Sequence, residues 1–140
     1  MGSHVNLERS LAANGRVGGH FVQGHVDGVG KIIAFRTEVD SLWVTVETPE
    51  SILKYIVEKG YITVDGTSLT VCEVTDTYFT FMLIKYTQGK IIIPGKKVGD
   101  LVNLEVDILG KHVERYMAGL ARHQEKKNLR ELAPKRISAL

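Results

Sequence analysis

Cysteine is nearly absent from this 140-residue sequence. The single cysteine, Cys72, cannot form an internal disulfide, and a zinc ribbon would need more thiols than the chain holds. Long apolar runs are missing too: Ile91-Ile92-Ile93 is far shorter than the roughly 20 residues of a membrane-spanning helix, and no signal-peptide pattern opens the chain. We therefore expect a soluble, cytoplasmic protein that does not interact with a membrane.

A strong excess of charge of one sign is missing as well. The net charge is +2, but residues 111–140 hold eight basic and three acidic residues, which leaves ten basic and thirteen acidic residues in 1–110. Residues 1–110 are mildly acidic and therefore offer no basic surface that would attract a phosphate backbone. In addition, only 7% of all residues are aromatic. The composition therefore argues against a nucleic-acid partner, including an OB-like module, and we interpret the basic C-terminal segment as a solvated helix.

What is present is an ordinary globular composition, with 44% hydrophobic and 24% charged residues. A chain of this length buries roughly two-thirds of the surface that its unfolded form exposes, so it needs neither disulfides nor a structural metal to hold a core. One domain of modest size is expected.

One tetrapeptide occurs twice. VNLE stands at residues 5–8 and again at 102–105, where it closes an all-β pattern that has no counterpart before the first copy. We interpret residues 5–16 as the closing strand of a missing first copy of the same domain, with coincidence as the alternative. Residues 1–4 (MGSH) are typical of a cloning remnant, residues 17–107 form the domain, and residues 108–140 form a C-terminal helix and tail.

Short strands separated by turn signals fill the domain. Residues 41–48 (SLWVTVET) alternate apolar and polar side chains, which is the period of a half-buried strand. The pair Asp65-Gly66, between strands at 61–64 and 68–74, supplies the positive φ of a tight hairpin turn. Further strands are expected at 20–26, 31–37, 77–84 and 96–106. This pattern of six or so strands predicts an all-β fold, a small antiparallel barrel.

Two segments have helical periodicity instead. Residues 49–57 place Ile52, Leu53, Ile56 and Val57 at helical spacing, which predicts a short helix that plugs one mouth of the barrel. From Lys111 onward a second helix carries an apolar stripe, which favours a packing or oligomer contact. The stripe consists of Val113, Tyr116, Met117 and Leu120. No order is expected after Pro134.

Two histidines, His20 and His25, lie in the expected barrel. Five residues apart on one strand they would face opposite sides, so no shared metal site is expected, and no other ligand spacing suggests one. Either side chain has an unperturbed pKa, roughly 6.5, that suits proton transfer near neutral pH, although a structural role is equally compatible. The glycine-rich stretches at 24–30 and 95–100 lack the spacing of nucleotide-binding loops and are interpreted as turns and bulges.

Hydroxyl side chains follow the Asp-Gly turn. Ser68 and Thr70 lie two residues apart and therefore share one strand face, either around a polar pocket at the barrel mouth or toward solvent. A triad of Ser68 and His25 with Asp65 or Asp107 has no nucleophile elbow to support it. Cys72 shares the Ser68 face by parity, and because no cation stands near it in the sequence, we expect an inert thiol.

Three longer segments together resemble the riboflavin synthase family: GGHFVQGHVDG (18–28), KYIVEKGYITVDGTSLTV (54–71) and KKVGDLVNLEVD (96–107). They are similar to the second lumazine-binding barrel of that enzyme, which has two tandem barrels followed by a C-terminal helix. The resemblance implies a six-stranded Greek-key barrel of the riboflavin-synthase type, with a short plug helix and a C-terminal α-helix.

The resemblance also implies an activity. Family members dismutate two molecules of 6,7-dimethyl-8-ribityllumazine into riboflavin and 5-amino-6-ribitylamino-pyrimidinedione, a transferase reaction that needs no metal or separate cofactor. They are typically homotrimers joined by their C-terminal helices, and each active site lies between a first barrel and the second barrel of a neighbour. By resemblance His25, Ser68 and Asp107 fall on catalytic positions. The ligand-binding positions are Gly24, Val26, Lys59, Asp65, Gly66, Thr67 and Thr70.

The resemblance is to a single barrel, and the reaction needs two facing lumazine sites. We therefore expect this chain to bind 6,7-dimethyl-8-ribityllumazine or riboflavin and to show little or no synthase activity by itself. The alternative is a non-catalytic carrier of a lumazine or a flavin.

Overall fold

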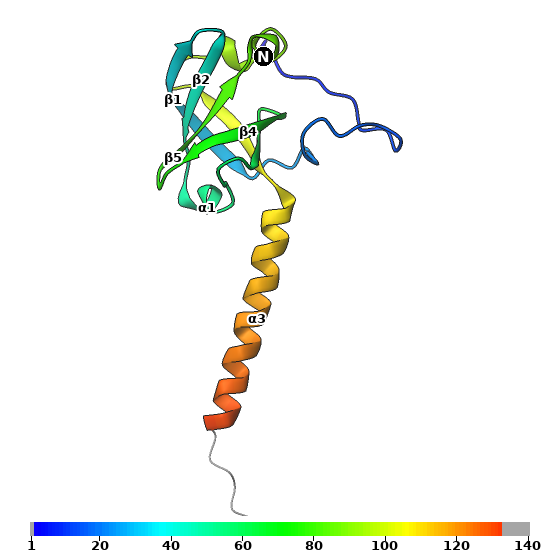
Figure 1. The fold of residues 1–140 in the computed structure, drawn as a ribbon, viewed down its shortest axis with the longest axis vertical. Coiled ribbons are helices and arrows are strands. Elements are labelled where there is room, and N and C mark those ends of the chain that lie inside the picture. The colour runs from blue at the N-terminus through cyan, green and yellow to red at the C-terminus, as the bar shows by residue number, and fades with distance from the viewer. Residues whose placement is uncertain (1, 133–140) are drawn as a thin grey trace, which may run out of the picture. The chain divides into compact units, whose positions relative to one another are not determined.

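The computed structural model describes residues 2–132 and divides into a barrel unit that ends at Ile108 and a helical unit that starts at Leu109. Figure 1 shows both units. The barrel strands are β1 (Gly28–Glu38), β2 (Ser41–Glu47), β3 (Tyr61–Val64), β4 (Thr67–Val74), β5 (Tyr78–Leu83) and β6 (Leu101–Val106). The helices are α1 (Glu50–Leu53), α2 (Lys85–Gln88), the 3-10 turn η1 (Ile93–Gly95) and α3 (Ile108–Leu132).

The six strands form a closed antiparallel barrel in the order β1-β2-β5-β4-β3-β6. Strand β1 closes the barrel because its first residues pair with β6 and the remainder pairs with β2. The hairpin β3–β4 turns at Asp65-Gly66, where both residues have positive φ, 46° and 82°. The predicted six-stranded antiparallel barrel and its Asp-Gly turn are confirmed.

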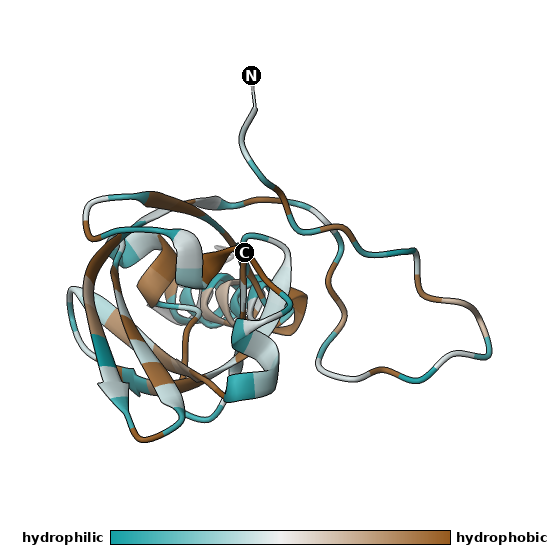
Figure 2. Cartoon of the chain, turned by 90° about the horizontal axis from the view of Figure 1, so that it is seen from above, coloured by the Kyte–Doolittle hydropathy of each residue, from teal (hydrophilic) through white to brown (hydrophobic). Residues whose placement is uncertain are grey.

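The barrel interior is filled by apolar side chains. Hydrophobic and hydrophilic residues alternate along several strands, as Figure 2 shows, and the inward set includes Val44, Ile62, Val71 and Phe81, all fully buried. The short helix α1 adds Ile52 and Leu53 to this core. Because side chains occupy the interior, a ligand site has to lie outside the closed sheet.

The short helix follows its predicted periodicity except at one end. Ile52, Leu53 and Ile56 are buried in the barrel core, as expected of a plug, but Val57 is 61% exposed. The helix ends at Leu53 and the chain then turns, so Val57 no longer lies on the buried helical face. The prediction that Val57 packs inward is wrong.

The strand predicted at residues 20–26 is also wrong. Residues 2–27 contain no strand, and β1 begins only at Gly28. Residues 5–16 contain no strand in this structure either, and their interpretation as the closing strand of a missing first copy stays a prediction. Strand β6 is shorter than expected, because residues 97–100 form a turn in which the Lys97 N–H donates to the Asp100 carboxylate at 2.8 Å.

Helix α3 starts at Ile108, the first residue of the predicted C-terminal segment 108–140, and it contains the periodic pattern expected from Lys111 onward. The apolar stripe of Val113, Tyr116, Met117 and Leu120 is exposed on it, by between 49% and 68%. The expectation about residues after Pro134 lies outside the described part of the chain. Among the described helices, none is long and apolar enough to cross a membrane.

Candidate functional site

A row of three polar side chains crosses the outer face of the barrel. Ser68 on β4 is the register partner of Thr63 on β3, and Thr63 is in turn the register partner of Glu105 on β6. Thr63 and Glu105 lie between buried apolar neighbours, and Ser68 precedes the buried Leu69, so all three point away from the core. Yet Thr63 is only 2% exposed and Glu105 only 5%, because another part of the chain covers them.

The cover at one end of this row is His20. Its Nδ1 atom lies 2.7 Å from the Ser68 hydroxyl and its Nε2 atom lies 3.1 Å from the Thr63 hydroxyl. The imidazole also stacks on the Tyr61 ring, with a centroid distance of 5.2 Å and an interplanar angle of 10°. One imidazole therefore joins the hydroxyls of a cross-strand pair, and in its neutral form one ring nitrogen donates while the other accepts.

The cover at the other end is the backbone of residues 23–25. The Gln23 N–H donates to Oε1 of Glu105 at 2.7 Å, and the N–H groups of Gly24 and His25 donate to Oε2 at 3.0 Å each. Gly24 adopts a φ of 77°, a conformation that glycine reaches without steric cost. The amides that were expected to pair in a strand ladder thus bind a carboxylate instead.

A cavity of about 760 Å³ lies beside this covered row. Its walls come from the segments 6–11 and 16–24, the hairpin turn and residues 90–91. The side chain of Asn6 holds the first segment in place: its amide nitrogen donates to the Asp65 carbonyl at 2.8 Å, and its oxygen accepts the Ile92 N–H at 2.9 Å. A volume of this size is within the range of cavities that take a small organic ligand.

Burial shifts the pKa values of His20 and Cys72. Burial lowers the pKa of His20 below its ordinary value of 6.5, although the charges of Asp107 and Glu105 act in the opposite direction. His20 is therefore mainly neutral at pH 7 and able to accept a proton. Burial raises the pKa of the Cys72 thiol, partly offset by a hydrogen bond to the Met82 backbone, so the thiol stays protonated, in keeping with the inert role expected for it.

Four of the expected site residues line this cavity: Gly24, Gly66, Thr67 and Ser68. Thr70 points outward on the same strand face as Ser68, as predicted, and is exposed. His25 donates its backbone N–H to Glu105 and leaves its side chain exposed. Asp107 follows β6 and is near enough to His20 to influence its charge.

The remaining expected residues do not line the cavity. Asp65 serves the hairpin: its carboxylate accepts the Asn103 N–H at 2.8 Å and pairs with the Lys96 ammonium at 2.9 Å. Lys59 has a positive φ of 63° and binds Val71 through its backbone, and Val26 is 58% exposed.

Sequence reasoning misplaced one residue of the site and missed two. His20 was considered as a proton carrier but placed on a strand opposite His25, whereas it is the histidine that contacts Ser68. Thr63 and Glu105 were treated as ordinary strand residues. The signal for Glu105 was available, because a charged residue at an outward strand position, next to an irregular glycine-rich segment elsewhere in the chain, is a candidate to bind that segment's amides.

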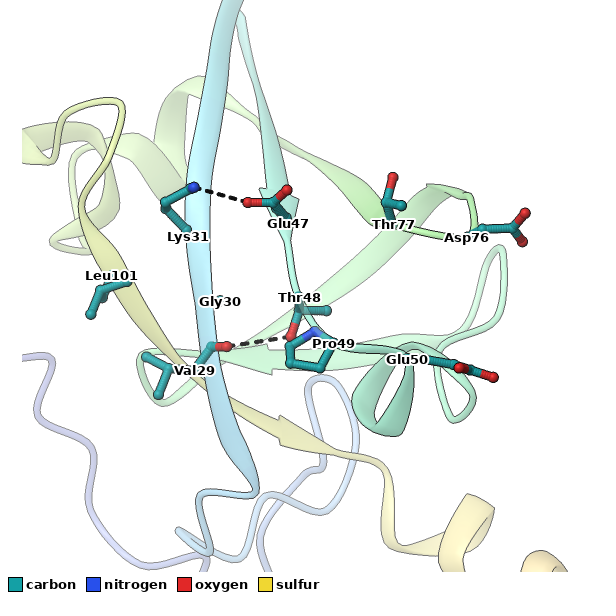
Figure 3. A pocket seen from close by; sticks show the side chains of 10 residues that line it. All are labelled: Val29, Gly30, Lys31, Glu47, Thr48, Pro49, Glu50, Asp76, Thr77 and Leu101. Carbon is teal, nitrogen blue, oxygen red and sulfur yellow. Dashed lines mark hydrogen bonds and ion pairs between the residues drawn. The ribbon is translucent and has the colours of Figure 1, made fainter.

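A second cavity, of about 480 Å³, lies at the ends of β1 and β2 (Figure 3). There Lys31 pairs with Glu47 at 3.0 Å, and the Thr48 hydroxyl donates to the Val29 carbonyl at 3.4 Å. None of the expected site residues lines it. Among residues 2–132, no group of three or more His, Cys, Asp or Glu side chains is arranged to hold a metal ion.

Comparison with known proteins identifies the barrel. The lumazine binding domain family matches residues 23–107. Riboflavin synthase of Schizosaccharomyces pombe is 50% identical over 115 residues, which are 81% of this chain and 55% of that protein. Riboflavin synthase of Actinobacillus pleuropneumoniae is 44% identical over 127 residues, which are 91% of this chain and 59% of that protein. The chain thus spans little more than half the length of these relatives.

Solved structures show the same fold. The crystal structure of LumP complexed with riboflavin has a TM-score of 0.61 at 22% identity and covers 66% of this chain and 50% of LumP. LumP complexed with 6,7-dimethyl-8-(1'-D-ribityl) lumazine has a TM-score of 0.60 at 22% identity and covers 64% of this chain and 51% of LumP. The chain therefore belongs to the lumazine binding domain family and carries a barrel of the kind found in riboflavin synthase.

Proposed function

We propose that this chain binds 6,7-dimethyl-8-ribityllumazine or riboflavin in the cavity beside His20 and Ser68, as one half of a riboflavin synthase active site. Two findings that agree with each other carry the proposal. The relatives that match most of the chain are riboflavin synthases, and the cavity is lined by the polar turn residues Gly66, Thr67 and Ser68 beside the His20 imidazole.

The chemistry of the cavity suits a ligand with a polyol chain and a heterocyclic edge. Hydroxyls such as those of Thr67 and Ser68 donate and accept, so they match the hydroxyls of a ribityl chain and the carbonyl and ring-nitrogen groups of a pyrimidine. The lining also includes Val17 and Phe21, which offer apolar surface to the flat ring. The ligand is expected to lie outside the barrel, since the interior is packed.

Dismutation requires a second bound lumazine that faces the first. A methyl group on the electron-poor ring loses a proton readily because the charge spreads into the heterocycle, and the resulting carbanion must meet the other ring. Well-oriented neighbouring reactants lower a barrier by about 7 to 11 kcal/mol, so the pairing of two barrels supplies much of the catalysis. In this proposal Ser68 exchanges protons with the ligand from within the cavity, His25 does so from the position that follows the lining residue Gly24, and Asp107 orients a donor or a water.

The test of binding is a riboflavin titration followed by flavin fluorescence. Ser68→Ala removes a hydroxyl from the cavity, and we expect its affinity for riboflavin to fall about tenfold. The matched control is Thr77→Ala, which removes an exposed hydroxyl from the second cavity and should leave the affinity unchanged. A chain that leaves the flavin spectrum unaltered, or a Thr77 variant as weak as the Ser68 variant, would contradict the proposal.

Catalysis is tested separately from binding. We expect the chain alone to form little or no riboflavin from 6,7-dimethyl-8-ribityllumazine, and addition of an isolated first barrel of a riboflavin synthase to restore formation. A carrier would bind the ligand but remain inactive in the mixture, so the mixing experiment separates the two functions. The exposed stripe of α3 is proposed as the contact between copies, which light scattering on the purified chain would measure.

A further inference from the structure

Glu105 occupies a strand position that ordinarily faces water. On the same outward face of β6, Leu101 is 61% exposed and Asn103 is exposed, whereas Glu105 is only 5% exposed. A carboxylate is costly to bury unless hydrogen bonds compensate for the lost water. The structure therefore has to provide partners for this charge.

The partners are consecutive backbone amides from a distant segment. Gln23, Gly24 and His25 each donate one N–H to the carboxylate, at 2.7, 3.0 and 3.0 Å, across about 80 residues of sequence. Hydrogen bonds to an ionised acceptor are roughly twice as strong as those between neutral groups. Because Gln23 and Gly24 are not part of any strand, this carboxylate is the partner for amides that a sheet would otherwise satisfy.

Two of these three residues, Gln23 and Gly24, belong to a wall of the cavity that is proposed to bind the ligand. Residues 18–24 line it, and this wall is fastened at two places: His20 on Ser68 and Thr63, and residues 23–25 on Glu105. Between the two attachments lie Phe21 and Val22, whose positions are set by both ends. A wall of irregular backbone keeps one shape only when it is held in this way.

We propose that Glu105 is a positioning residue for ligand binding: its carboxylate fixes residues 23–25 and thereby shapes the wall of the lumazine or flavin cavity. The inference rests on the proposed function for the identity of the ligand. The hydrogen bonds between Glu105 and residues 23–25 do not depend on that function. Glu105 does not line the cavity itself, so its effect on a ligand is transmitted through the backbone of Gln23 and Gly24.

The test compares Glu105→Gln with Asn103→Ala. The glutamine keeps the shape of Glu105 but removes the charge and replaces one acceptor oxygen by an N–H₂ group, which cannot accept from an amide. Asn103→Ala alters a neighbouring exposed side chain on the same face of the strand. Two measurements are made on each variant: the ¹H–¹⁵N spectrum of the backbone amides, and riboflavin affinity from flavin fluorescence.

In Glu105→Gln we expect the amide signals of Gln23, Gly24 and His25 to shift and to exchange faster with solvent, while the amides of β3 and β4 keep their protection. Riboflavin affinity should fall about tenfold or more. Asn103→Ala should leave the amide signals of residues 23–25 and the affinity as in the unmodified chain.

Unchanged amide signals for residues 23–25 in Glu105→Gln would overturn the inference, as would shifted signals with unchanged affinity. A loss of protection throughout the barrel would also overturn it, since Glu105 would then support the fold as a whole. If the unmodified chain binds no riboflavin, the proposed function fails, and that result is separate from the comparison between the variants.

Discussion

Gly19 lies against Ser68 so closely that no side chain fits between them. A Cβ atom added to Gly19 would lie 2.2 Å from the Ser68 hydroxyl oxygen and 2.8 Å from the Ser68 Cβ. The neighbouring Gly18 has open space around it. The close approach lets His20, the next residue, place its ring between Ser68 and Thr63.

Gly19→Ala is therefore expected to push the 18–20 segment away from β4. The displacement should cost about 1–3 kcal/mol in the free energy of unfolding, the usual penalty for overfilling a packed contact, and should weaken riboflavin binding. Urea unfolding and a riboflavin titration measure the two effects. Gly18→Ala is the matched control, and equal behaviour of the two variants would show that the contact with Ser68 has no such effect.

Thr63→Val is expected to destabilise the chain. The substitution preserves shape at a position that is 2% exposed but removes the hydroxyl that shares a hydrogen bond with His20. The expected loss is about 1 kcal/mol, measured by chemical denaturation. Thr80→Val is the control, because the Thr80 hydroxyl is buried without a hydrogen-bond partner among the described residues, and its removal should be neutral or stabilising.

His20 is expected to titrate below its ordinary pKa of 6.5, because burial disfavours the imidazolium more than Asp107 and Glu105 favour it. The unfolded chain then binds a proton more readily than the folded chain. The contribution of His20 to stability should accordingly be complete above pH 6.5 and decline as the pH falls from 6.5 through the lower folded pKa.

An NMR titration of the imidazole C–H signals measures this midpoint, and unfolding curves of the unmodified chain and of His20→Gln between pH 5 and 8 measure the linkage. We expect the stability of the unmodified chain to fall more steeply with acid than that of the variant. A midpoint at or above 6.5 would contradict the prediction, because Asp107 and Glu105 would then raise the pKa of His20 by at least as much as burial lowers it.

Val39→Asn is expected to stabilise the barrel. Val39 has a φ of 53° at the tip of the β1–β2 hairpin and is 94% exposed, so it gains nothing from packing while its branched side chain adopts an unfavourable conformation. Asparagine tolerates this region, and the expected gain is about 1 kcal/mol in thermal or urea unfolding. Val39→Thr, which remains branched at Cβ, should show no such gain.

The barrel was predictable from local sequence signals. The alternation in residues 41–48 and the Asp65-Gly66 turn are short-range features that act within a few residues, and β2 and the β3–β4 hairpin lie where these signals place them. Parity alone also placed Ser68 and Thr70 on one face, opposite Leu69 and Val71.

The site was harder to predict because its contacts are long-range. Residues 20–26 look like a strand by composition, but the amides of residues 23–25 donate to Glu105, some 80 residues away, and Gly24 turns the backbone to a positive φ. Once that segment is no longer a strand, the argument that His20 and His25 face opposite sides does not apply. Which of the two histidines contacts Ser68 depends on a tertiary contact that sequence periodicity does not encode.

The packed interior of the barrel affects which substitutions such a protein can accumulate during evolution. The buried core residues that hold the sheet together point inward, whereas the residues that line the proposed ligand cavity lie on the outer surface and in the irregular segment 16–24, so the two sets are different residues. Substitutions that retune ligand preference can accumulate in the segment while the scaffold's folding stability is spared, provided that Gly19 and Glu105 keep their places.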